Sequence, residues 1–277
     1  MKLLYPFARR FIAGDNFISA KPIIDDLLSK KFEVILNFIG EENDSKREAI
    51  NVQKEYLELL RQYQNHQVSL SMKLSQFGIL DSESQCIDLI EPIISNAYQS
   101  KQTIRFDSED SSSTDKILNV CYLLNKEYPN TLGYTLQSNL FRSKDDVLGL
   151  IKSNISIRLV KGAYKENNSN AYKKKNMVRD NFLYLADIIN NHHHFNSAIA
   201  THDELLINEL KTSDFKYEFL FGVRRDIQTS LISKNYKVGI YLPYGNNWFP
   251  YTIRRLKEWK NISFIGRNII REWINAV

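Results

Sequence analysis

The sequence has few of the residues that mark disulfide-rich, zinc-binding or fibrous proteins. Its two cysteines, Cys86 and Cys121, lie in separate segments without C-x-x-C spacing, and only 10 glycines and 6 prolines occur in 277 residues. This pattern excludes a disulfide framework or zinc finger and is typical of a reducing compartment. Because no Pro/Gly/Ser-rich linker divides the chain, the sequence predicts a single domain.

Long apolar runs are also missing. No segment approaches the roughly 18 apolar residues that cross a bilayer, and the N-terminus does not resemble a signal peptide. We therefore expect a soluble, cytoplasmic protein that is still able to dock on the inner face of the membrane. The chain has 37 basic and 32 acidic residues. Its one dense basic run, 173–175, is typical of a solvated helix end, so we expect no nucleic-acid partner.

Short β-branched runs alternate with helical periods along the chain. The predicted strands are 32–39, 68–73, 103–107, 133–137, 155–160, 197–201, 217–221 and 238–242. Eight such units in this length indicate a (β/α)8 barrel. The competing doubly wound sheet would bring a G-x-G-x-x-G turn, which the sequence does not contain. The barrel would span about residues 32–260, after a short helical lead-in over 1–31 and before a C-terminal extension over 261–277.

Polar side chains follow nearly every predicted strand. They are Lys73, Asp107, Gln137, Arg158, Lys161, Thr201, His202, Asp203, Arg224, Tyr241 and Tyr244. The carboxyl ends of the strands carry the active site in barrels of this type. Any one of these residues has a structural explanation such as a helix cap, but several charges buried at one face require a compensating ligand. Four cations with little acid predict a pocket for an anion or for an electron-rich reduced cofactor.

A last predicted helix carries a second group of polar residues. Tyr251, Arg254, Arg255 and Glu258 are spaced i, i+3, i+4 and i+7, so they share one face. That face is either solvated, with an internal Arg–Glu pair, or part of the pocket. The aromatic segment before it favours the pocket, where adjacent arginines suit bidentate capture of a carboxylate. The histidine run 192–194 has no acidic neighbours, and we expect no metal site.

These segments resemble the monofunctional bacterial proline dehydrogenases along essentially the whole chain. The similar segments are FARRFIAG (7–14), SMKLSQFG (71–78), IRFDSED (104–110), TLQSNLFRS (135–143), RLVKGAY (158–164), ATHD (200–203), YEFLFGVRRD (217–226) and YLPYGNNWFPYTIRRLKE (241–258). The resemblance implies a barrel that binds FAD noncovalently. It would oxidise L-proline to Δ1-pyrroline-5-carboxylate, the first step of proline catabolism, by hydride transfer to flavin N5. The electrons would pass to a membrane quinone.

The resemblance also implies roles for individual residues by matching position. Asp107 and Arg158 would be catalytic. The implied cofactor contacts are Ser108, Gln137, Arg158, Lys161, Gly162, Ala163, Thr201, His202 and Arg224. The implied substrate contacts are Lys73, Tyr241, Tyr251, Arg254, Arg255 and Glu258.

Other functions remain open on the sequence alone. A flavin barrel of this kind could oxidise hydroxyproline, a ring-size analogue or an N-substituted amino acid instead. A non-catalytic flavin-binding barrel belongs to a different class and would require a disrupted site. A phosphate-binding barrel isomerase is less consistent with the sequence, because the paired arginines lie on a predicted helix rather than in a Gly-rich turn.

Overall fold

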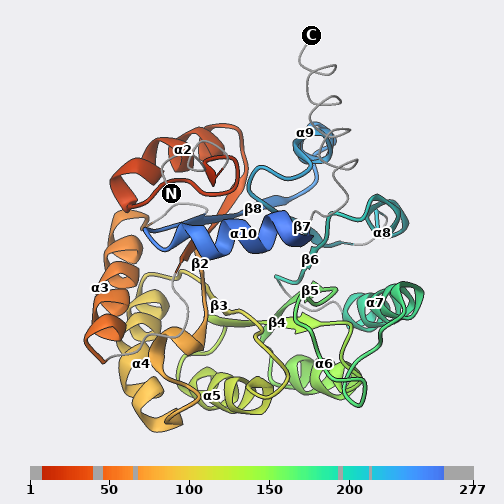
Figure 1. Cartoon of the computed structure of the whole chain (residues 1–277), viewed down its shortest axis with the longest axis horizontal. Coiled ribbons are helices and arrows are strands. Elements are labelled where there is room, and N and C mark those ends of the chain that lie inside the picture. The colour runs from red at the N-terminus through yellow and green to blue at the C-terminus, as the bar shows by residue number, and fades with distance from the viewer. Residues whose placement is uncertain (1–7, 40–45, 65–67, 193–195, 212–213, 259–277) are drawn as a thin grey trace. The chain divides into compact units, whose positions relative to one another are not determined.

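The computed structural model describes residues 8–39, 46–64, 68–192, 196–211 and 214–258. Eight parallel strands form a closed barrel in the order β1 to β8 (Figure 1). The strands are β1 (Glu33–Phe38), β2 (Val68–Met72), β3 (Ile104–Phe106), β4 (Leu132–Gln137), β5 (Ser156–Val160), β6 (Ala198–Ala200), β7 (Lys216–Leu220) and β8 (Val238–Tyr244). The predicted (β/α)8 fold is confirmed.

Helices alternate with the strands, as parallel pairing requires. They are α2 (Phe17–Ser29), α3 (Lys46–Gln62), the 3-10 turn η2 (Leu74–Phe77), α4 (Glu83–Gln99), α5 (Thr114–Glu127), α6 (Ser143–Lys152), α7 (Lys175–Asn191), α8 (Glu204–Glu209), α9 (Arg225–Ser233) and α10 (Trp248–Glu258).

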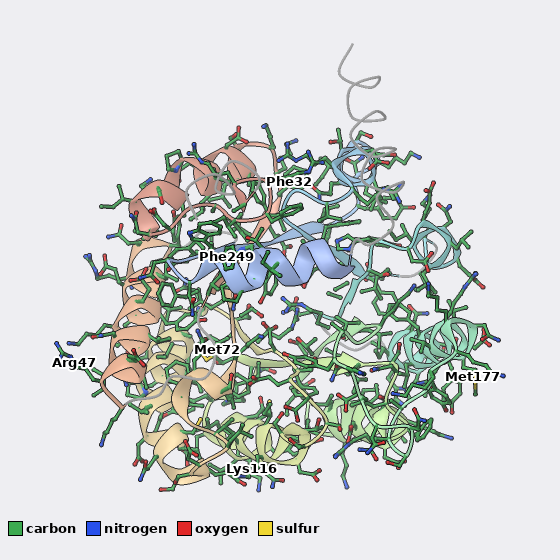
Figure 2. All side chains as sticks on the ribbon, in the orientation of Figure 1. Phe32, Arg47, Met72, Lys116, Met177 and Phe249 are labelled. Atoms are coloured by element: carbon green, nitrogen blue, oxygen red, sulfur yellow. The ribbon has the colours of Figure 1, made fainter. Side chains whose placement is uncertain are left out.

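The chain divides into two compact units, and the larger one comprises Glu41–Lys216. Its strands β2 to β6 pair in sequence, for example Leu70 with Ile104 and Tyr134 with Ile157. Every residue of β4 is buried, including the polar Thr135 and Gln137, as expected for a parallel strand that is covered on both faces. Helices α3 to α7 lie outside β2 to β5 in Figure 1. In Figure 2, Met72 lies among the interior side chains, whereas Arg47 and Met177 lie at the periphery.

The smaller unit comprises Met1–Gly40 and Tyr217–Val277, and it pairs β8 with both β1 and β7. The prediction that the last strand ends at Leu242 is wrong, because β8 continues through Pro243 to Tyr244. Proline has no N–H to donate to a strand ladder. The Pro243 carbonyl still accepts a hydrogen bond from the Ala13 N–H at 2.8 Å, which ties the N-terminal segment to this strand.

Gly222 follows β7 and sets the path of the backbone before α9. Its φ of +75° lies in the left-handed region, which side chains with a Cβ rarely adopt. A Cβ at this position would lie 1.8 Å from the backbone oxygen of Arg10. The nearest atoms, the carbonyl oxygen and carbon of Arg10, belong to the backbone, so they cannot move aside cheaply.

We predict that Gly222→Ala lowers the free energy of unfolding by at least about 2 kcal/mol, through combined strain and overlap. Thermal unfolding followed by circular dichroism would show this as a lower Tm. Gly149→Ala is the matched control, because there the added Cβ approaches only the far end of the Tyr122 side chain, with its hydroxyl at 2.6 Å. An unchanged Tm in Gly222→Ala would contradict the close approach to Arg10.

Candidate active site

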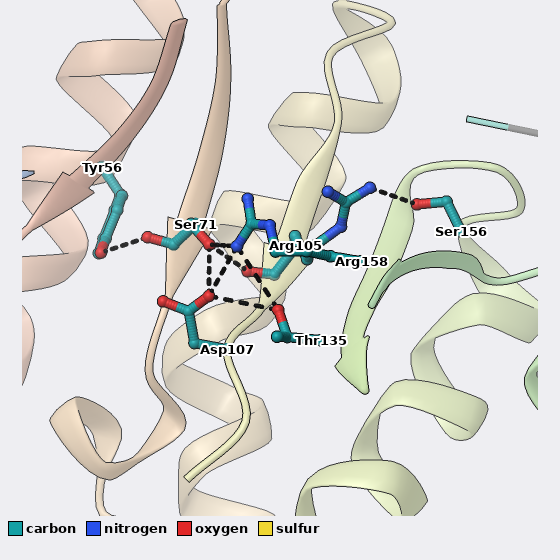
Figure 3. A network of polar contacts seen from close by, with 7 residues as sticks. All are labelled: Tyr56, Ser71, Arg105, Asp107, Thr135, Ser156 and Arg158. Atoms are coloured by element: carbon teal, nitrogen blue, oxygen red, sulfur yellow. Dashed lines mark hydrogen bonds and ion pairs between the residues drawn. The ribbon is translucent and has the colours of Figure 1, made fainter. Parts of the chain in front are cut away.

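An arginine inside the larger unit forms the centre of a buried polar network (Figure 3). The Arg158 Nη1 atom, on β5, donates to Asp107 Oδ1 at 2.9 Å and to Ser71 Oγ at 2.9 Å. The Ser71 hydroxyl itself donates to Asp107 Oδ1 at 2.7 Å, and the Thr135 hydroxyl lies 3.4 Å from the same oxygen. The side chains of Arg158 and Asp107 are only 4% and 11% exposed, so this is a buried ion pair.

Strand register brings these groups together. Thr135 on β4 lies opposite Arg158 on β5, and Asp107 directly follows β3, with its N–H donating to the Met72 carbonyl at 2.8 Å. A buried ion pair is stable only when hydrogen bonds satisfy its remaining polar atoms. Ser71 and Thr135 provide such bonds, and sequence reasoning identified neither of them. Ser71 could have been found from its position two residues before Lys73, because side chains two residues apart on a strand point to the same face.

A second arginine, Arg105 on β3, also has a buried side chain. Its Nη2 donates to Ser156 Oγ at 3.2 Å and to the Asn196 carbonyl at 3.3 Å. Gly133 leaves the space that this guanidinium uses, because a Cβ there would lie 2.9 Å from Arg105 Nε. Arg105 was not among the predicted site residues.

Lys73 directly follows β2 and meets an aromatic side chain from the loop after β5. Its ammonium donates to the Tyr164 hydroxyl at 3.2 Å and lies 5.9 Å from the ring centroid. Burial raises the pKa of Tyr164, an effect that the Lys73 charge partly offsets, so the phenol stays neutral at physiological pH. Tyr164 was not among the predicted site residues, although it closes the RLVKGAY segment.

Apart from Arg158, which lies within β5, the cofactor residues predicted in the larger unit lie at or beyond the ends of successive strands. Ser108 follows β3, Gln137 ends β4, and Lys161, Gly162 and Ala163 follow β5, while Thr201 and His202 follow β6. Gly162 has φ +103°, and a Cβ on it would lie 2.1 Å from the Asn139 amide oxygen. Only glycine therefore fits this position.

The expectation of a cation-rich pocket with little acid is wrong for three of the four cations. Arg158 pairs with Asp107 at 2.9 Å, Lys161 with Asp203 at 2.5 Å, and Arg224 with Asp226 at 3.0 Å. Burial alone would raise the pKa of Asp203, but the hydrogen bond and charge of Lys161 outweigh it and lower that pKa. For the buried Arg158 and Arg224 the physical reason is that an unpaired buried charge is strongly unfavourable, so the fold supplies a counter-ion. The Lys161–Asp203 pair is partly exposed.

The remaining predicted residues belong to the smaller unit. Arg224 is a buried residue with φ +55° that immediately precedes α9. Tyr241 lies within β8 and is half-buried. Tyr251 packs in a hydrophobic cluster that includes Phe11 and Trp248. Positions 254, 255 and 258 lie on α10, which confirms the helix that their spacing predicted, but the side chains of Arg254, Arg255 and Glu258 lie outside the described part of the chain.

Neither metal ligands nor membrane spans are found in the described ranges. Within them, no group of three or more His, Cys, Asp or Glu side chains could hold a metal ion. His192 is exposed at the end of α7, and 193–194 lie outside the described residues. None of the helices in this part of the chain is long and apolar enough to cross a bilayer.

A closed (β/α)8 barrel with charged side chains at its strand ends belongs to the class of barrel enzymes. The proline dehydrogenase family model matches residues 20–267, and the chain belongs to this family. It is therefore assigned to the oxidoreductases of proline metabolism.

Curated relatives support the assignment over nearly the full length. The chain is 29% identical to proline dehydrogenase 1 of Bacillus subtilis, covering 96% of this chain and 91% of that protein. It is 30% identical to the proline dehydrogenase of Deinococcus radiodurans, covering 97% and 91%.

Solved structures show the same fold in larger proteins. Proline utilization A from Bdellovibrio bacteriovorus, inactivated by N-propargylglycine, matches with a TM-score of 0.82 at 20% identity over 92% of this chain. Proline utilization A from Bradyrhizobium japonicum, as a D779Y mutant, matches with a TM-score of 0.78 at 16% identity. The chain spans about a third of the length of each, 33% and 31%.

We predict that Asp107→Ala lowers the free energy of unfolding by about 3–5 kcal/mol, because it leaves the Arg158 charge buried without its carboxylate. Denaturant unfolding would measure the loss. Asp25→Ala serves as the control: it removes an equally direct ion pair, Lys21–Asp25 at 2.6 Å, whose side chains are 52% and 51% exposed, and should change stability by less than about 1 kcal/mol. An equal loss of unfolding free energy in the two variants would show that the buried ion pair contributes no more to stability than an exposed one.

Proposed function

We propose that this protein oxidises L-proline to Δ1-pyrroline-5-carboxylate with noncovalently bound FAD and passes the electrons to a quinone. The observation that carries the proposal is the arrangement in the larger unit. Lys73 with Tyr164 and the Arg158–Asp107 pair come from strands β2, β3 and β5 and the loops that follow them, in a chain of the proline dehydrogenase family. Lys73 would provide a positive charge for a substrate carboxylate, and Arg158 provides a guanidinium whose position is fixed by Asp107.

The residues present fit FAD. The Asn139 amide oxygen is buried, and no donor among the described residues reaches it. A buried acceptor without a donor is unfavourable, and a flavin or ribityl group carries suitable N–H and O–H donors. The backbone N–H of Asn139 donates to the Lys161 carbonyl at 2.9 Å, and Gln137, Lys161 and Thr201 at the ends of β4, β5 and β6 bring further donors and acceptors for a flavin nucleotide. When bound, FAD supplies the redox chemistry by accepting a hydride equivalent at flavin N5.

We assign the substrate side to six residues, following the roles that the family resemblance implies. Lys73, Arg254 and Arg255 would bind the carboxylate of proline, since adjacent arginines suit bidentate capture. Tyr241, Tyr251 and Glu258 would enclose the ring. The proline loses a hydride from the carbon next to nitrogen and a proton from the nitrogen, so the substrate carboxylate keeps its charge throughout and needs a fixed cationic site.

Asp107 and Arg158 would act on the reacting centre. The guanidinium of Arg158 is held by Asp107 and Ser71, so its charge is fixed before the reaction begins. A preorganised cation stabilises negative charge that develops during electron transfer to a cofactor. Ser108, Gly162, Ala163, His202 and Arg224 would complete the cofactor site. We further propose a cytoplasmic protein that contacts the membrane peripherally when it meets the quinone.

The visible absorption spectrum of the purified protein tests the proposal. We expect flavin bands that bleach on anaerobic addition of L-proline, and FAD in the supernatant after heat or acid denaturation. Turnover should require a quinone or an artificial dye, and NAD⁺ should not support it. Release of FMN, no flavin in a folded protein, or proline-dependent formation of NADH would each contradict the proposal.

We predict that Arg255→Met lowers kcat/KM for proline about 10- to 150-fold, the equivalent of a charge-assisted hydrogen bond worth roughly 1.5–3 kcal/mol. Most of the change should be a raised KM, because the carboxylate is held equally in ground and transition states. Arg254→Met should behave likewise. Flavin content should not change.

Lys257→Met provides the matched control. It removes a cation from the same helix at a position outside the i, i+3, i+4, i+7 face, and its KM should stay near that of the wild type. A wild-type KM in Arg255→Met would show that this residue does not bind the substrate.

A further inference from the structure

Glu109, a buried residue that was not among the predicted site residues, is bonded to two segments that carry predicted site residues. Glu109 lies two residues after Asp107, in the loop between β3 and α5, and is 8% exposed. Its Oε1 accepts the backbone N–H of Ser75 at 3.0 Å. Its backbone carbonyl accepts the side-chain amide of Gln137 at 2.9 Å.

Ser75 belongs to the turn that carries Lys73. The 3-10 turn η2 starts directly after Lys73, whose extended backbone precedes it without any side-chain cap bond. An ammonium group cannot provide such a bond, because it has no acceptor. Glu109, from 34 residues further along the chain, accepts the Ser75 N–H instead. The backbone that leads out of Lys73 is therefore held by a residue from the next strand's loop.

We propose that Glu109 is a positioning residue that fixes Lys73 for the substrate carboxylate and Gln137 for the cofactor. This inference rests on the proposed function of the same site. Glu109 holds the Lys73 turn through its side chain and the Gln137 amide through its main chain. The two contacts set the spacing between the substrate cation and the cofactor amide.

The charge of Glu109 gives a competing explanation that can be tested separately. Burial raises the pKa of Glu109, while its bonds to Ser75 and the charge of Lys73 oppose that rise and Asp107 adds to it. Cys86 and Tyr164 also experience the Glu109 charge. If position is what matters, an uncharged acceptor of the same length should replace the carboxylate. If charge is what matters, a shorter carboxylate should do so.

Two conservative variants separate these explanations in the intact, flavin-loaded enzyme. Glu109→Asp keeps the charge but shortens the side chain by one methylene, so it no longer reaches the Ser75 N–H. Glu109→Gln keeps the length and an acceptor oxygen but loses the charge. For Glu109→Asp we expect the KM for proline to rise about 10-fold with kcat within about threefold. For Glu109→Gln we expect a KM within about threefold of the wild type.

Glu166→Asp is the matched control. Glu166 is also 8% exposed, and its Oε1 also accepts a backbone N–H, that of Ser111 at 3.0 Å. Ser111 lies further along the loop that carries Asp107 and Glu109, and among the described residues no bond joins Glu166 to the Lys73 turn. Glu166→Asp therefore tests whether loosening this loop alone is enough to raise the KM, which should stay within about twofold of the wild type. Flavin retention, read as the ratio of visible to ultraviolet absorbance, should fall slightly in Glu109→Asp only, because the main-chain bond to Gln137 shifts with the loop.

Three results would overturn the inference. They are a wild-type KM in Glu109→Asp, a raised KM in Glu109→Gln that matches that of Glu109→Asp, and an equal rise in Glu166→Asp. Failure of the proposed function itself would look different, since the wild-type protein would then not be reduced by proline at all.

Discussion

The ion pair between Arg158 and Asp107 is the interaction around which the candidate site is built. A guanidinium with 4% exposure inside a barrel is stable only when its charge is met by a carboxylate and by hydroxyl groups. These groups come from three strands: Ser71 lies on β2, Asp107 directly follows β3, and Thr135 lies on β4. The strands that surround Arg158 must therefore keep their register for this charge to remain buried.

The same requirement recurs at the other cations. Lys161 is paired with Asp203 and Arg224 with Asp226, so most of the positive charge at the strand ends is held in place rather than free. A held cation can stabilise charge on a bound group without first being reorganised. At Lys73, the ammonium donates to the hydroxyl of Tyr164 from the loop after β5.

Glycines and loop carboxylates provide the remaining constraints. Gly162 allows the Asn139 amide to pack against the backbone after β5, and Gly133 leaves room for the Arg105 guanidinium. Glu109 and Glu166 each accept a backbone N–H from a loop that follows another strand. Loops are the mobile part of most barrels, and these buried carboxylates fasten the loops where the site residues lie.

The sequence by itself determined the alternation of strands and helices, and therefore the barrel. Apolar β-branched runs and helical periods are local signals, and polar residues such as Lys73 and Gln137 could be placed at strand ends from them. Only the tertiary structure decided which side chains meet. Arg158 and Asp107 are 51 residues apart, Arg158 and Ser71 are 87 apart, and Lys161 and Asp203 are 42 apart. No local pattern specifies such pairs, because they depend on strand register and on the free energy of burying each charge with its partner.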